Sequence, residues 1–186
     1  MKNKFLDILI RYLILVLIAL PGFGLFYFAF SLATIYPVYF LLNLFFKVSL
    51  TGTTIMIASC FPIEIIGACV GGGAYFLLLF LNLSLPKIKI LKRIKMILFA
   101  FVSFLIINIL RIFLLSLMYY SSSPFSEAVH KLFWYIGSVL FVVGIWFTEV
   151  KIFKLKQVPV YSDLKFLYSN SSLRKQLNKS KRTKQN

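Results

Sequence analysis

The chain has 186 residues, of which 60% are hydrophobic and 14% charged, and it carries a formal net charge of +16. Its mean hydropathy of +0.90 is far above the range of soluble domains, so the sequence predicts an integral membrane protein. The basic residues lie mostly between and after the apolar runs, as in loops beside anionic lipid, which argues against a nucleic-acid partner and for contact with membrane lipids.

Several apolar runs approach the ~20 residues that a helix needs to cross a hydrocarbon core, and the alternating segments of a membrane barrel are missing. We therefore expect an all-α bundle of about four transmembrane helices, with a small external interfacial helix and a short β-like element outside the membrane. The two cysteines and one histidine lack the spacing of a zinc site. The sequence predicts neither a metal nor another cofactor.

The first apolar stretch, residues 12–46, follows a basic N-terminus. As one helix it would be roughly 50 Å long, too long for an ordinary span. We expect one span at about residues 9–31 and an external interfacial helix at about 35–46, where tyrosines suit the headgroup zone. The alternative is two short spans hinged at residues 21–24, which would place the N-terminus outside.

The next segments are rich in β-branched residues. Residues 53–59 and 61–66 are too short for spans and predict an extended or hairpin element at the outer surface. A second span follows at about residues 66–85 and ends at Pro86.

The second half of the chain alternates basic or polar segments with apolar runs. A basic loop at residues 87–95 precedes a third span at about 96–117. A polar loop at 119–127 separates it from a fourth span at about 129–150. We treat residues 1–150 as one membrane-embedded domain and residues 151–186 as a basic tail, partly disordered.

The distribution of positive charge predicts the orientation. Of the 21 Lys and Arg residues, three lie in the N-terminus, five in residues 87–95 and ten in the tail. The positive-inside rule places these segments in the cytoplasm. Cys69, the end of the third span and His130 are then expected toward the extracytoplasmic face of a cell membrane.

Four residues of the third and fourth spans are candidates for chemistry. Asn108 and Arg111 are three apart and share one helix face, although an arginine near a helix end also snorkels to the headgroups. His130, with Glu127 three residues earlier, begins the last span, and an imidazole changes charge near neutral pH. A lone interfacial histidine is also common without any catalytic role.

Cys69 lies in the run Gly67-Ala68-Cys69-Val70-Gly71, at the predicted outer start of the second span. A cysteine in such a run often only packs, but a helix N-terminus and a nearby cation favour a reactive thiolate. Glycines such as Gly71 would let a substrate backbone approach. Cys60 lacks this setting and is interpreted as structural. A disulfide between the two cysteines stays open.

These features resemble the exosortase/archaeosortase family of membrane transpeptidases. Three elements carry the resemblance in order: a β-rich lead-in ending in Ala68-Cys69-Val70-Gly71, an N-x-x-R-I motif at Asn108–Ile112, and His130 followed by Gly137. They cover about residues 49–147 and are most like the compact archaeal forms. Val70 departs from the Ser or Thr that commonly follows the cysteine.

The resemblance implies a catalytic set of Cys69, Arg111 and His130, with Asn108, Gly71 and Glu127 in supporting positions. It implies substrates that are surface proteins ending in a sorting signal, which consists of a short motif, a transmembrane helix and a basic end. The cysteine would form a thioester and transfer the protein to an anchor, perhaps a lipid. The alternative is a non-enzymatic transport or assembly protein of the membrane.

Overall fold

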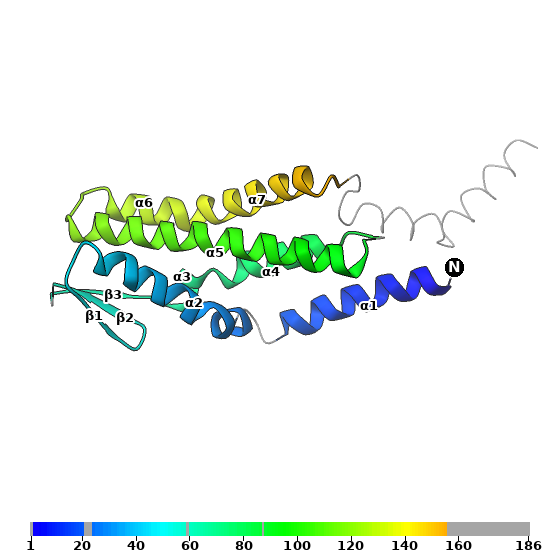
Figure 1. Ribbon diagram of the computed structural model, residues 1–186, viewed down its shortest axis with the longest axis horizontal. Coiled ribbons are helices and arrows are strands. Elements are labelled where there is room, and N and C mark those ends of the chain that lie inside the picture. Colours follow the sequence, from blue (N-terminus) through cyan, green and yellow to red (C-terminus); the bar gives the residue numbers. More distant parts are fainter. Residues whose placement is uncertain (1, 21–23, 59, 87, 156–186) are drawn as a thin grey trace, which may run out of the picture.

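The computed structural model describes residues 2–20, 24–58, 60–86 and 88–155. It is an elongated bundle of helices along one axis, with a small sheet at one end and the N-terminus near the other (Figure 1). The elements are α1 (Lys2–Ala19), α2 (Gly24–Asn43), β1 (Val48–Thr51), β2 (Thr54–Ile57), β3 (Phe61–Glu64), α3 (Gly67–Val70), α4 (Gly72–Leu83), α5 (Ile90–Tyr120), α6 (Ser126–Leu132), the π-helix η1 (Phe133–Gly137) and α7 (Ser138–Ile152).

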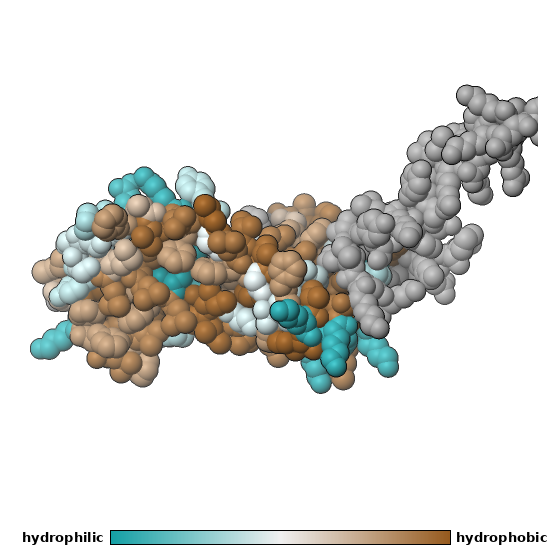
Figure 2. Space-filling model, turned by 90° about the horizontal axis from the view of Figure 1, so that it is seen from above, coloured by the Kyte–Doolittle hydropathy of each residue, from teal (hydrophilic) through white to brown (hydrophobic). Residues whose placement is uncertain are grey.

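Three described helical segments are long and apolar enough to cross a membrane: Gly24–Asn43, Ile90–Tyr120 and Ser126–Ile152. The segments Ile8–Ala19 and Gly67–Leu83 are apolar but shorter. In Figure 2 hydrophobic residues cover the middle of the bundle, and hydrophilic residues gather toward the sheet end and toward the opposite end. A polytopic helical membrane protein is therefore confirmed, with three long helical segments and two shorter ones where we expected four spans.

The N-terminal stretch divides at a different place from the one we expected. α1 ends at Ala19, and α2 runs without a break from Gly24 to Asn43, through residues 31–35 where the span was to end. The predicted interfacial helix at 35–46 is thus the second half of α2. The two helices run in the same direction (Figure 1), so they form no hairpin of two opposed spans. Pro21 lies just after the end of α1, and proline disfavours the helical conformation of the residue before it.

The predicted β-like element is a three-stranded antiparallel sheet of order β1-β2-β3. Its first strand was not anticipated from the sequence. Ile55, Ile57 and Ile65 are buried, and they pack with residues of α2 and α5 in one hydrophobic cluster. Burial of these isoleucines, at about 1.5–3 kcal/mol each, attaches the sheet to the helices.

The second span is interrupted. Gly71 has a left-handed backbone (φ +78°) and separates the single turn α3 from the 12-residue α4. At the other end of α4, Arg93 donates hydrogen bonds to the carbonyl oxygens of Leu83 (3.0 Å) and Leu85 (2.7 Å). Arg11 donates a longer one to Leu83 (3.4 Å). Basic side chains therefore satisfy carbonyls that the end of α4 leaves without helical partners.

α5 begins earlier than predicted. It starts at Ile90, so most of the basic segment 87–95 forms its first turns and not a loop. Lysine and arginine are good helix formers, and their long side chains reach water from the end of a membrane helix. The last span also begins early, at Ser126, and contains the π-helix between α6 and α7. Of the predicted tail, residues 156–186 lie outside the described residues.

Candidate active site

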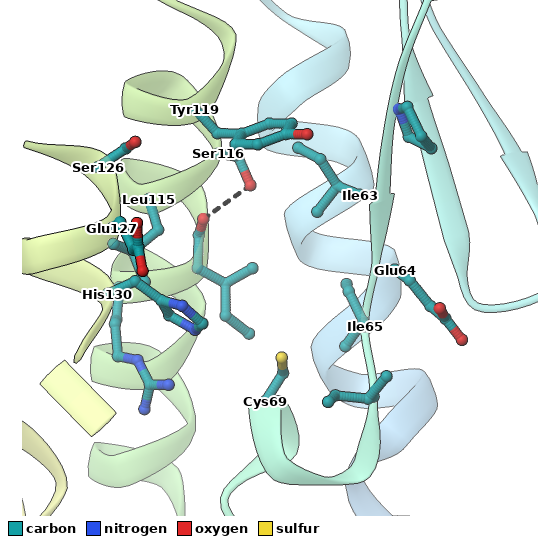
Figure 3. Close-up of a pocket in the computed structure, with 14 residues that line it drawn as sticks. Ile63, Glu64, Ile65, Cys69, Leu115, Ser116, Tyr119, Ser126, Glu127 and His130 are labelled. Atoms are coloured by element: carbon teal, nitrogen blue, oxygen red, sulfur yellow. Dashed lines mark hydrogen bonds between the residues drawn. The ribbon is translucent and has the colours of Figure 1, made fainter. Parts of the chain in front are cut away.

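A cavity of about 580 Å³ opens between β3, α3, the last turns of α5 and α6 (Figure 3). Cys69 of α3, Arg111 of α5 and His130 of α6 all line it. The structure thus brings together the three residues that the sequence singled out, from parts of the chain that are 42 and 19 residues apart. The other lining residues are Pro62, Ile63, Glu64, Ile65, Ile66, Ile112, Leu115, Ser116, Tyr119, Ser126 and Glu127.

Two backbone hydrogen bonds hold Cys69 in place. Its N–H donates to the carbonyl oxygen of Ile66 (2.8 Å), and its own carbonyl oxygen accepts a bond from Nδ2 of Asn108 (2.8 Å). The thiol is partly buried and points into the cavity (Figure 3). We expected Cys69 at the start of a long helix. It lies instead in the single turn α3. The dipole of one turn is small, so the nearby cation is the larger influence on the sulfur.

That cation is Arg111, which is only 4% exposed. Its Nη1 donates to Oδ1 of Asn108 over 3.5 Å, and the guanidinium is close enough to attract a Cys69 thiolate. Its Nε has no hydrogen-bond partner among the described residues. Arg111 also lines the cavity, so its guanidinium can bind an anionic oxygen there, whereas a snorkelling arginine would reach the membrane surface.

Asn108 forms hydrogen bonds with both Cys69 and Arg111. Its side chain is fully buried, and its amide bonds the Cys69 carbonyl oxygen while its oxygen accepts from Arg111. A second, longer bond joins its Nδ2 to the carbonyl oxygen of Val70 (3.3 Å). The predicted shared face of Asn108 and Arg111 on α5 is therefore confirmed. One residue determines both where the cysteine backbone lies and where the guanidinium points.

His130 and Glu127 lie on the cavity side of α6, opposite β3 (Figure 3). His130 is exposed. Glu127 forms an exposed ion pair with Lys131 (2.7 Å). The π-helix η1 follows directly after α6, and such bulges are frequent near functional sites.

Gly71 belongs to a different cavity from the one that contains Cys69. It lines a groove of about 500 Å³ between α3, α4 and α7, bordered by Gly67, Ala68, Gly72, Gly73, Ala74, Leu77, Arg111, Ser138, Val139 and Val142. A Cβ at Gly71 would lie 2.9 Å from Cζ of Phe104, so backbone conformation and packing explain this glycine. Arg111 is common to both cavities.

Cys60 lies apart from this site. It is exposed, it lines neither cavity, and both cysteines are free thiols, so no disulfide joins them. Within the described ranges, no three His, Cys, Asp or Glu side chains are placed to hold a metal ion. Sequence reasoning missed the contribution of β3 and the two residues after it, since residues 62–66 line the cavity. The Pro within a short β-branched segment was the available signal, because proline within a sheet indicates an edge strand.

The fold and the cavity together define a membrane-embedded helical protein with a thiol, a buried guanidinium and an imidazole around one opening. The family model described as transmembrane exosortase matches residues 2–149. This match covers most of the chain, and the protein belongs to the transmembrane exosortase family. The match extends beyond residues 49–147, on which the resemblance was based, and includes both N-terminal helices. Neither a curated protein nor a solved structure matches the chain significantly.

Proposed function

We propose that this protein is a membrane cysteine protease and transpeptidase that cleaves the C-terminal sorting signals of surface proteins and transfers them to an anchor. Membership of the exosortase family supports the general class. The observation that carries the assignment of residues is that Cys69, Arg111 and His130 line one cavity although they come from three separate elements.

In the first step, the thiol proton of Cys69 passes to His130 and the sulfur attacks the carbonyl carbon of the scissile peptide bond. The resulting oxyanion accepts hydrogen bonds from the guanidinium of Arg111, which lines the same cavity. The carbon–nitrogen bond then breaks, and His130 returns the proton to the departing nitrogen. The substrate remains attached to Cys69 as a thioester.

In the second step, an amine or hydroxyl of an acceptor attacks the thioester carbon. His130 takes the proton of the acceptor and gives it back to the sulfur as the carbon–sulfur bond breaks. A lipid acceptor would leave the surface protein anchored in the membrane, whereas water would release it as a free acid. The hydrogen bond from Asn108 to the carbonyl oxygen of Cys69 positions the nucleophile for both steps.

We further propose that the cavity faces the extracytoplasmic side. Lys92, Arg93 and Lys95 lie in the first two turns of α5, whereas Arg111 is near the other end of this 31-residue helix. Arg11 also binds at the basic end. A cytoplasmic location of that end follows from the positive-inside rule.

The test is maturation of a co-expressed reporter that ends in a sorting motif, a transmembrane helix and a basic segment from the same genome. Variants Cys69→Ala and Cys69→Ser should both abolish maturation, because a serine hydroxyl at this site is not ionised. Cys60→Ala is the matched control and should mature the reporter normally. Normal maturation by Cys69→Ala at equal protein level would place the nucleophile elsewhere and reject the proposal.

A further inference from the structure

The strand β3 is an edge of the sheet, and its free edge borders the cavity that contains Cys69. β3 pairs with β2 on one side, and the sheet ends there. Five consecutive residues, 62–66, line the cavity. Three of them, Pro62, Ile63 and Glu64, belong to β3, and side chains of successive strand residues point to opposite faces, so the cavity borders the backbone edge of the strand.

The pairing register identifies the backbone groups on this edge. The N–H of Ile65 donates to the carbonyl oxygen of Thr53, so the backbone groups of residues 61, 63 and 65 face β2. Those of Pro62, Glu64 and Ile66 face the other way. The N–H and C=O of Glu64 and the N–H of Ile66 have no hydrogen-bond partner within the described residues. The carbonyl of Ile66 is already bonded to the N–H of Cys69.

Pro62 limits where another strand can pair. It has no N–H to donate, and proline on an exposed edge is a common protection against pairing with other chains. The N–H groups that remain available on this edge belong to Glu64 and Ile66, which are its residues closest to Cys69 along the chain. The Glu64 carboxylate points away from Cys69, and Ile63 and Ile65 point to the cavity side (Figure 3).

We propose that the substrate binds as an added β-strand along β3, through the backbone groups of Glu64 and Ile66, which place its scissile bond at Cys69. This rests on the proposed function. An extended peptide fits because unpaired backbone groups at a sheet edge recognise main chain, whatever the side chains. The substrate strand runs parallel to β3, because β3 leads from the sheet end toward the helices (Figure 1), the course of a chain that continues into a transmembrane helix.

The experiment uses the full-length protein and the maturation reporter described above. Glu64→Pro removes the central donor of the edge without touching the ladder to β2, and it should slow maturation about tenfold, the loss expected for one or two backbone hydrogen bonds. Glu64→Ala keeps the donor but removes the same carboxylate, so it should mature the reporter several-fold faster than Glu64→Pro does. Pro62→Ala should mature the reporter at least as fast as wild type, since it only adds an N–H to the edge.

Binding is measured separately in the Cys69→Ala variant, with a photo-reactive residue in place of Glu64 or of Ser49 on the opposite edge strand. The reporter should cross-link at position 64 and not at position 49, a result that also holds if Glu64→Pro fails to fold. Equal cross-linking at both positions, or equal losses for Glu64→Pro and Glu64→Ala, would overturn the added strand. Maturation by Cys69→Ala itself would instead reject the proposed function, so the two failures are distinct.

Discussion

The side-chain amide of Asn108 donates a hydrogen bond to the main-chain carbonyl oxygen of Cys69 across 2.8 Å, between two elements 39 residues apart in the chain. We expect Asn108→Ala to lower maturation at least tenfold, because it frees the Cys69 backbone and removes the acceptor that orients Arg111. An unsatisfied buried carbonyl costs about 1–3 kcal/mol, so stability should fall as well.

Asn82 provides the control for this variant. It is equally buried, but it bonds Glu149 (3.1 Å) and Leu78 (3.0 Å) far from the thiol. Asn82→Ala should destabilise the protein without slowing alkylation of Cys69 by iodoacetamide in a Cys60→Ala background. Asn108→Ala should slow that alkylation. Equal alkylation rates in the two variants would show that Asn108 has only a structural role.

Arg111→Lys should reduce maturation about a hundredfold or more, although it keeps the positive charge. Lysine lacks the planar group that bonds Asn108 and still presents other donors to an oxyanion. Arg93→Lys, at the far end of the same helix, is the control and should retain activity. The two variants are compared by the initial rate of reporter maturation at matched protein amounts. A wild-type rate for Arg111→Lys would contradict the role of Arg111 in binding the oxyanion.

His130→Ala should slow maturation by about 10² to 10⁴, as is typical when a general acid or base is removed, and should leave the protein folded. The neighbouring Lys131→Ala breaks only the ion pair with Glu127, which is exposed and screened by solvent, and should be nearly silent. Single-turnover maturation measures both. Comparable effects of the two variants would remove His130 from the mechanism.

Gly71→Ala should lower the melting temperature and the yield. The left-handed backbone at this residue costs an alanine about 1–2 kcal/mol, and its Cβ would lie 2.9 Å from the Phe104 ring. Gly144→Ala in α7 adds a Cβ with nothing within 4 Å and should be tolerated. Thermal unfolding in detergent compares them. A normal melting temperature for Gly71→Ala would mean that α3 and α4 join differently from the way described.

Orientation is tested by labelling with an impermeant thiol reagent in intact cells. Cys60 is exposed near the sheet and should label from outside, and Cys69 lines a cavity proposed to open on that side, so single cysteines are introduced in a background that carries both Cys60→Ala and Cys69→Ala. Ser122→Cys, in the turn after α5, should label, and Lys151→Cys, in the last turn of α7, should label only after the cells are opened. Labelling of Lys151→Cys in intact cells would reverse the proposed topology.

The pattern of residues along the chain was sufficient for the membrane class, because long apolar runs have no stable place in water. It also identified Asn108, Arg111 and His130, since a polar group inside an apolar run needs a compensating role. The shared face of Asn108 and Arg111 followed from helical spacing alone. These are local properties, and local properties can be read from a sequence.

Tertiary contacts decided several helix boundaries and the surroundings of Cys69. The early start of α5 and the interruption at Gly71 depend on which helix packs against which, as the close contact of Gly71 with Phe104 illustrates. The break between α1 and α2, in contrast, lies at residues 20–23, where the alternative interpretation of the sequence placed a hinge. The same holds for the edge strand β3 beside Cys69. Pro62 within the strand indicates an edge, but only the packing of the sheet against the helices places that edge beside Cys69.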